Sequence, residues 1–201
     1  MGDMAIMKLN PDSHMILDQS LLRLPNELLR KNLKAAQLAV EKDSTFVKAT
    51  LKGQASVSLS NAASATETLN GLDTLIARVR GLKRKLATCE DDENRLRNHL
   101  CSRIKHLSDL YSIQTFDDVK YGAWSRTRLD RLVVDYCLRN GFAESAKALA
   151  QEKDIEALVD CDTLIQMDRI RKSIRNGKIT EALAWCQENK KELRKIDVRV
   201  L

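Results

Sequence analysis

Residues 124–152 read WSRTRLDRLVVDYCLRNGFAESAKALAQE, and this stretch decides the fold. From Leu129 onward, apolar residues recur at steps of three and four and form one stripe on an α-helix. Gly141 ends that helix, because the chain needs a left-handed residue there and only glycine adopts that conformation without strain. A second short helix with a small apolar face follows. The stretch therefore predicts a tight helical hairpin.

The first helix of this hairpin carries apolar side chains on two opposite sides. Val134 and Leu138 lie roughly opposite the stripe that begins at Leu129. One short helix cannot cover both sides, so we expect a further partner to cover the rest. The predicted oligomerisation interface consists of Leu129, Leu132, Val133, Tyr136, Cys137, Phe142, Ala146 and Leu149.

The composition favours an all-α chain. Seven glycines, two prolines and 4% aromatic residues among 201 residues suit long helices better than sheets. The net charge of +6 is modest and its cations lie among 28 acids, so a nucleic-acid partner is not required. We expect no membrane-spanning segment, because the chain has no apolar run of eighteen residues. We expect no signal peptide, because the N-terminus has no basic region followed by an apolar stretch. Five cysteines without close spacing indicate reduced thiols.

Two long helices are expected ahead of the hairpin, within a coiled-coil region over residues 25–114. The first begins at Pro25 and ends near Gly53, where a serine-rich run predicts a turn. The second begins at a capping box formed by Ser64 and Glu67. Its apolar seam is the clearest periodic feature of the chain and includes Leu72, Leu75, Val79, Leu82, Leu86, Leu96, Leu100 and Leu107.

A single helix with this seam would not be stable in water, so a partner helix is implied. The partner is either the preceding helix, folded back, or a copy from another chain. Glu93 and Arg103 interrupt the seam and either fix its register or mark a change of partner.

The boundaries of the remaining segments are inferred from residues that begin or end helices. Residues 1–24 are expected to form a loosely held arm, and residues 115–122 a linker to the hairpin. A further helix is expected to be capped by Asp162 and to end at Gly177, and a last helix to begin near Thr180.

The hairpin resembles the LisH motif, over residues 124–156. The residues that carry this resemblance are Leu132-Val133-x-x-Tyr136 and Gly141-Phe142-x-x-Ser145-Ala146-x-x-Leu149. Cys137 stands where the motif usually has leucine. The resemblance implies that two hairpins form halves of a helical bundle. The alternative is an ordinary helix pair inside a larger helical core.

Residues 160–195 resemble the first half of a CTLH domain. Together with Trp124, Arg126, Arg128 and the coiled coil, they make the chain similar to the macrophage erythroblast attacher family. Members of that family are RING-type subunits of the CTLH (GID) E3 ubiquitin ligase complex. Residues 196–201 are expected to diverge from the CTLH pattern, so the resemblance implies a shortened form without the RING-like domain.

No catalytic or metal-binding motif is recognisable. His14, His99 and His106 are separated along the chain, and only Cys101 lies near His99 and His106. We interpret Cys101, His99 and His106 as solvated helix positions, and the alternative is an incidental metal site. No cysteine has a recognisable nucleophile motif. We expect no cofactor and no metal. The basic run over residues 78–85 is interpreted as the solvated outer face of a coil, since no aromatic residue that would stack on bases lies nearby.

The uncovered apolar surface predicts a non-catalytic assembly subunit, and the resemblance to the macrophage erythroblast attacher family implies an E3 ubiquitin ligase complex that acts in ubiquitin-dependent degradation in the cytoplasm and nucleus. Its partner would be a related LisH/CTLH subunit or a second copy. One alternative is an active RING-type ligase in a full-length form. The other is a basic coiled-coil binder of nucleic acid or of a cytoskeletal filament, whose affinity would depend strongly on salt.

Overall fold

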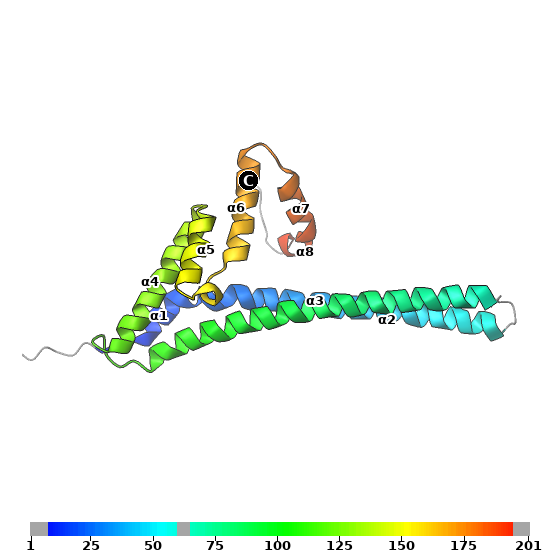
Figure 1. The fold of residues 1–201 in the computed structure, drawn as a ribbon, viewed down its shortest axis with the longest axis horizontal. Coiled ribbons are helices and arrows are strands. Elements are labelled where there is room, and N and C mark those ends of the chain that lie inside the picture. Colours follow the sequence, from blue (N-terminus) through cyan, green and yellow to red (C-terminus); the bar gives the residue numbers. More distant parts are fainter. Residues whose placement is uncertain (1–7, 60–64, 195–201) are drawn as a thin grey trace, which may run out of the picture. The chain divides into compact units, whose positions relative to one another are not determined.

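The computed structural model describes residues 8–59 and 65–194 (Figure 1). Within these ranges the chain is helical, with one isolated bridge between Lys8 and Thr115, which confirms the all-α prediction. The helices are α1 (Pro11–Asp18), α2 (Ser20–Leu59), α3 (Ala65–Tyr111), α4 (Val119–Arg139), α5 (Ala143–Glu152), the 3-10 helix η1 (Glu156–Leu158), α6 (Cys161–Arg175), α7 (Thr180–Glu188) and α8 (Lys190–Leu193). Among the described helices, none is long and apolar enough to cross a membrane.

The described residues divide into two units, which we call the coil unit and the hairpin unit. The coil unit holds residues 12–59 and 65–108, and the hairpin unit holds residues 8–11 and 109–194.

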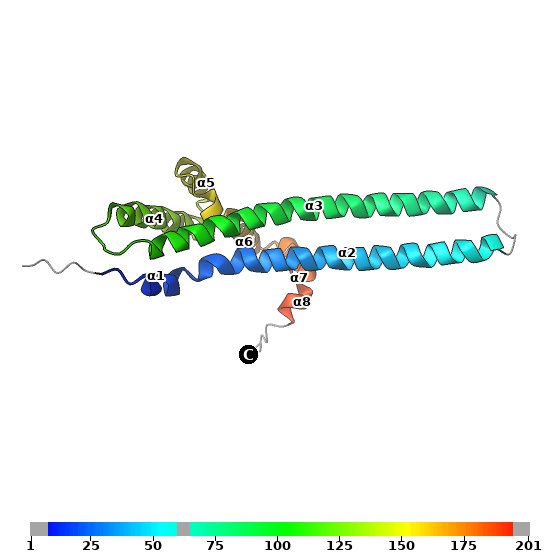
Figure 2. The same ribbon diagram turned by 90° about the horizontal axis from the view of Figure 1, so that it is seen from below.

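In the coil unit, α2 and α3 run side by side in opposite directions (Figure 2). Asn32 donates a 2.7 Å hydrogen bond from its side-chain amide to the carbonyl of Cys89. Farther from this point, Arg78 Nε donates to the carboxylate of Asp43 over 2.6 Å. These contacts pair α3 with the preceding helix of the same chain, which is one of the two partners that the sequence left open.

Most of the predicted seam residues of α3 are at least partly shielded from solvent. Leu75 and Leu107 are buried, and four further seam leucines are half-buried: Leu82, Leu86, Leu96 and Leu100. Leu72 and Val79 are wrongly placed by the prediction, because their side chains remain 43% and 50% exposed. The positions facing α2 at this end of the coil are instead those of Gly71 and Arg78.

The ends of α2 differ from the expectation. Helix begins at Pro11 and again at Ser20, so residues 11–24 are not the loose arm that was predicted. At its other end α2 continues through Gly53 to Leu59, because the side chain of Gln54 packs across α3 at Gly71 and helix contacts therefore persist beyond the glycine. The expected capping residue of α3, Ser64, lies outside the described residues.

Two apolar clusters hold the hairpin unit together. The first joins α4, α5 and η1 and consists of Val134, Leu138, Ala146, Ala150, Ile155 and Val159. The second fixes the start of α4 on the end of α3 and consists of Leu9, Leu110, Ile113 and Trp124, with Tyr121 packed against it.

Several boundaries of the hairpin unit lie close to those predicted. Asp118 caps α4 by accepting a 2.9 Å hydrogen bond from the backbone N–H of Lys120, so α4 begins inside the expected linker. Helix α6 begins at Cys161, and Asp162 therefore lies in its first turn and is not its cap. Gly177 has a φ of +73°, as its predicted role at a helix end requires, and α7 begins at Thr180 as expected.

Candidate assembly interface

The turn of the hairpin closes as the sequence predicts. Gly141 has a φ of +85°, and its N–H donates to the carbonyl of Leu138 over 3.2 Å. The N–H of Phe142 donates to the carbonyl of Cys137 over 2.9 Å. This pair of bonds is a Schellman motif, which satisfies two carbonyls at the end of α4 and turns the chain into α5.

The two helices of the hairpin pack through small residues on α5. Val134 and Leu138 are buried on α4, and Ala146 and Ala150 are both fully buried on α5. Alanine has no side chain beyond Cβ, so the two helices approach closely at these positions. The hairpin therefore buries one side of α4 and leaves the opposite side uncovered.

The uncovered side carries most of the predicted interface. At 100° per residue, the stripe that starts at Leu129 lies opposite Val134 and Leu138. We call the following exposed residues the hairpin face: Leu129 (60% exposed), Leu132 (41%), Val133 (41%), Tyr136 (66%) and Phe142 (58%). The first four lie on one face of α4, and Phe142 is the residue before α5. Such a group of exposed large apolar side chains is typical of an interaction site.

Three predicted interface residues lie elsewhere. Cys137 and Leu149 are half-buried and pack against the core of the hairpin. Ala146 is fully buried between the two helices, so its side chain is inside the chain's own core. For Cys137 the periodicity alone could not decide, because both sides of α4 are apolar. Ala146 and Leu149 lie on α5, on the side that packs against α4.

An ionic contact holds α6 against the turn of the hairpin. The carboxylate of Asp168 is buried beside Gly141, and a Cβ atom on that glycine would lie 3.1 Å from Asp168 Oδ1. Asp168 also pairs with Lys172 over 2.7 Å and with Arg171 over 2.5 Å.

The same two cations reach the end of α4. Arg171 Nη1 donates to the carbonyl of Arg139 over 3.1 Å, and Lys172 Nζ donates to the carbonyl of Gly141 over 3.4 Å. Positive side chains near the carbonyl end of a helix are stabilising, because that end carries partial negative charge. We call Asp168, Arg171 and Lys172 the turn latch.

The ion pairs of the turn latch lower the pKa of the Asp168 carboxylate. Hydrogen bonds from Lys172, and then from Arg171, lower the pKa of Asp168 below its ordinary value of 3.8, against the opposing effect of burial. Sequence reasoning missed this latch. The available signal was an acid followed by two cations at i+3 and i+4 on α6, which on its own reads as a solvated helix face.

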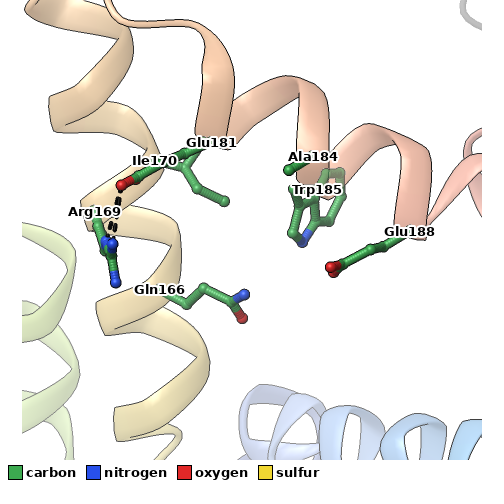
Figure 3. Close-up of a pocket in the computed structure, with 7 residues that line it drawn as sticks. All are labelled: Gln166, Arg169, Ile170, Glu181, Ala184, Trp185 and Glu188. Carbon is green, nitrogen blue, oxygen red and sulfur yellow. Dashed lines mark hydrogen bonds and ion pairs between the residues drawn. The ribbon is translucent and has the colours of Figure 1, made fainter.

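A small open cavity lies between α6 and α7 and has a volume of about 190 Å³ (Figure 3). Trp185 lies in its wall, and Arg169 donates to the Glu181 carboxylate across it, with Nη2 3.0 Å from Oε1. Trp185 is 38% exposed, so it forms a partly open wall of this cavity.

The thiols and the metal-ligand types are dispersed. All five cysteines are free, and burial raises the pKa of the Cys161 thiol above its ordinary value. Within residues 8–59 and 65–194, no three His, Cys, Asp or Glu side chains come together in a way that could hold a metal ion.

Comparison with protein families identifies two regions. Residues 127–152 match the LisH model, and they coincide with the hairpin described above. Residues 163–201 match the model of the CTLH/CRA C-terminal to LisH motif domain. This second match includes residues 196–201, which were expected to diverge from the CTLH pattern.

Similar proteins cover nearly all of the chain. The chain is 51% identical over 197 residues to Protein FYV10 of Pyricularia oryzae, with 98% of this chain and 48% of that protein aligned. It is 50% identical over 196 residues to Protein FYV10 of Chaetomium globosum, covering 98% of the chain and 44% of the relative. Protein fyv10 of Emericella nidulans is 48% identical over 188 residues, or 94% of the chain and 46% of the relative. The chain thus spans about half the length of these relatives.

Proposed function

We propose that this chain, with its LisH hairpin and its CTLH region, is an assembly subunit of a CTLH-type E3 ubiquitin ligase complex. The observation that carries the proposal is the hairpin face, which the chain's own helices leave uncovered. A surface of this kind is buried by another subunit, since burying apolar area is the main favourable term in association.

The chemistry of the hairpin face suits pairing with another hairpin of the same type. In a two-fold symmetric contact the same apolar patch of each subunit packs against that patch of the other. Fully burying a leucine, valine or phenylalanine contributes about 1.5–3 kcal/mol relative to leaving it exposed. Tyr136 adds a large rigid side chain whose hydroxyl can remain hydrogen-bonded at the rim.

The wider setting follows from the resemblance to the macrophage erythroblast attacher family. The proposal places the chain in ubiquitin-dependent degradation, in the cytoplasm and nucleus, with a related LisH/CTLH subunit or a second copy as its partner. The relatives named FYV10 align with 98% of this chain at 50–51% identity, which supports the same helical arrangement in both. In this proposal the present residues assemble the complex, and ubiquitin transfer belongs to a RING-like domain.

Sedimentation velocity of the purified chain tests the assembly role. We expect the chain to form dimers at micromolar concentration and the Leu132→Asp variant to be monomeric while keeping its helical circular dichroism. Leu132 is 41% exposed, so the aspartate stays hydrated in the monomer and the hairpin remains folded.

Two further variants serve as controls. Leu38→Asp changes a leucine on α2 that is 48% exposed, and it should leave the dimer intact. Val134→Asp should instead unfold the hairpin, because Val134 is fully buried and an uncompensated charge there is costly. A Leu132→Asp variant that assembles like the unchanged chain would refute the hairpin face as the interface.

A further inference from the structure

One side of α6 lies against the hairpin, and its chemistry changes along the helix. Cys161, Leu164 and Ile165 pack against the apolar core of the hairpin. Asp168 and Lys172 follow at helical spacing, so they continue the same side of α6 toward the hairpin turn. α6 is therefore held on the hairpin by apolar contacts near its start and by ionic contacts farther along.

The ionic contacts reach one particular peptide unit, the one between Gly141 and Phe142. Its carbonyl oxygen, on Gly141, accepts the 3.4 Å hydrogen bond from Lys172 Nζ. Its N–H, on Phe142, donates to the carbonyl of Cys137 over 2.9 Å. A peptide unit is planar and rotates as one body, so a bond at each end fixes its orientation. α6 supplies one of these two bonds, and α4 supplies the other.

The end of α4 depends on α6 in the same way. The carbonyl of Arg139, the last residue of α4, accepts the 3.1 Å hydrogen bond from Arg171 Nη1. The last carbonyls of a helix have no partner within that helix, so they need one elsewhere. Asp168 is 5% exposed beside Gly141 and pairs with both cations, which holds them at the turn. The turn latch thus brings two donors to the carbonyl groups of the turn.

The peptide unit that the turn latch holds carries a residue of the hairpin face. Phe142 is 58% exposed and is the residue before α5. Its carbonyl accepts the 3.0 Å hydrogen bond from the N–H of Ala146 that begins that helix. Because the rotamers open to a side chain depend on its backbone angles, a rotation of the Gly141–Phe142 peptide would move the phenyl ring relative to the apolar stripe on α4.

We propose that α6 positions the hairpin face for assembly, with Asp168, Arg171 and Lys172 as positioning residues that act through Phe142. The inference rests on the proposed function and goes beyond it, because it makes a helix of the CTLH region part of the LisH interface. The latch holds Phe142 in the orientation in which a partner buries it, so association does not have to order that residue. A broken latch weakens the contact.

Coupling of this kind is reciprocal. If the docking of α6 strengthens the contact at the hairpin face, occupation of that face stabilises the docked α6 by the same free energy. Another side of α6 faces α7, where Arg169 pairs with Glu181 (Figure 3). Assembly through the hairpin face therefore also stabilises the packing of the CTLH region on the hairpin.

Hydrogen exchange of the Phe142 amide, followed by NMR, measures the positioning without any partner. Lys172→Met removes the ammonium group that bonds to Gly141, and the side chain of Lys172 is 59% exposed, so the fold tolerates the change. At a concentration where the chain is monomeric, the Phe142 amide should exchange about fivefold faster in this variant, because its peptide unit has lost one bond. Arg175→Met is the matched control, since Arg175 is the other cation in the last turn of α6, and it should leave the exchange unchanged.

Sedimentation velocity tests the consequence for assembly. The dissociation constant of the dimer should rise about fivefold in Lys172→Met and stay unchanged in Arg175→Met. In a Phe142→Ala background, Lys172→Met should have no further effect, because the latch acts through that side chain. A general loss of stability would instead weaken the dimer equally in both backgrounds, and this outcome would overturn the proposal.

The inference and the proposed function fail in different ways. Unchanged exchange of the Phe142 amide in Lys172→Met overturns the inference, even in a chain that dimerises through the hairpin face. A chain that stays monomeric at every concentration contradicts assembly with a second copy, whereas faster exchange of the Phe142 amide in Lys172→Met still supports its positioning by α6.

Discussion

Arg103 donates a 2.8 Å hydrogen bond from its guanidinium to the backbone carbonyl of Leu21. That carbonyl lies four residues before Pro25, whose nitrogen carries no hydrogen and so cannot make the usual helical bond to it. Arg103 is 1% exposed, and its reach across to α2 supplies the missing donor. The residue that interrupts the leucine seam therefore satisfies the backbone of a proline-containing helix and fixes the register of α2 on α3.

Replacing Arg103 should expose this dependence. We expect Arg103→Met to lower the free energy of unfolding by about 1–3 kcal/mol, because the Leu21 carbonyl is left without this donor. In a Pro25→Ala background the helix regains its own N–H at that position, so the same substitution should cost less. Urea unfolding of the four proteins, followed by circular dichroism, measures the coupling between the two sites.

Additive effects of Pro25→Ala and Arg103→Met would contradict this account of the pair. Arg95→Met is the control for the loss of an arginine from α3, because both side chains of the Arg95–Asp92 ion pair are exposed. It should change the free energy of unfolding by less than about 1 kcal/mol.

Gly141→Ala should destabilise the hairpin unit. Alanine at a φ of +85° costs about 1–2 kcal/mol, and its Cβ would press on the Asp168 carboxylate. Gly122→Ala is the matched control, because Gly122 lies inside α4 with open space around its Cβ position. Thermal unfolding should show a lower free energy of unfolding for Gly141→Ala. For Gly122→Ala the free energy of unfolding should rise by about 0.5–1 kcal/mol. An equal response of both glycines would contradict a special role for the turn.

The turn latch makes part of the stability depend on pH. Because the pKa of Asp168 is lower in the folded chain than its ordinary 3.8, its contribution is complete above that value and is lost as pH falls through the lower folded value. The stability difference between the unchanged chain and Asp168→Asn should therefore be constant at neutral pH and shrink below about pH 4. Thermal unfolding between pH 7 and pH 3 measures it, and a difference that grows in acid would contradict the latch.

The cysteines should react with maleimide in an order set by burial. Cys101 and Cys186 are exposed and should be labelled first. Cys161 should be the slowest, because burial raises the pKa of its thiol and reduces the thiolate fraction. Time-resolved mass spectrometry of the labelled chain gives the order. Labelling of Cys161 at the rate of Cys101 would mean that α6 does not stay packed on the hairpin.

The sequence predicts the elements that depend on a single local cause. Only glycine fits the left-handed turns at positions 141 and 177, and both turns form as expected. The leucine periodicity likewise predicts α3, because a long run of regularly spaced apolar residues has one helical interpretation.

Periodicity fails where it must choose between two apolar sides. Leu72 and Val79 fit the seam by spacing, yet in that part of α3 it is Arg78 that pairs with Asp43 of α2, and Leu72 and Val79 remain exposed. On α4 both sides are apolar, and the small residues of α5, Ala146 and Ala150, select the side of Val134 for the core. Such choices depend on residues far away in the sequence.

The length of α2 has a consequence for distances. Its 40 residues rise 1.5 Å each, so the helix is about 60 Å long. The α2–α3 pair therefore sets a fixed distance along the coil unit, in steps of one heptad. Adding seven residues to α2 and seven to α3 would lengthen the pair by about 10 Å while keeping every side chain on its original side.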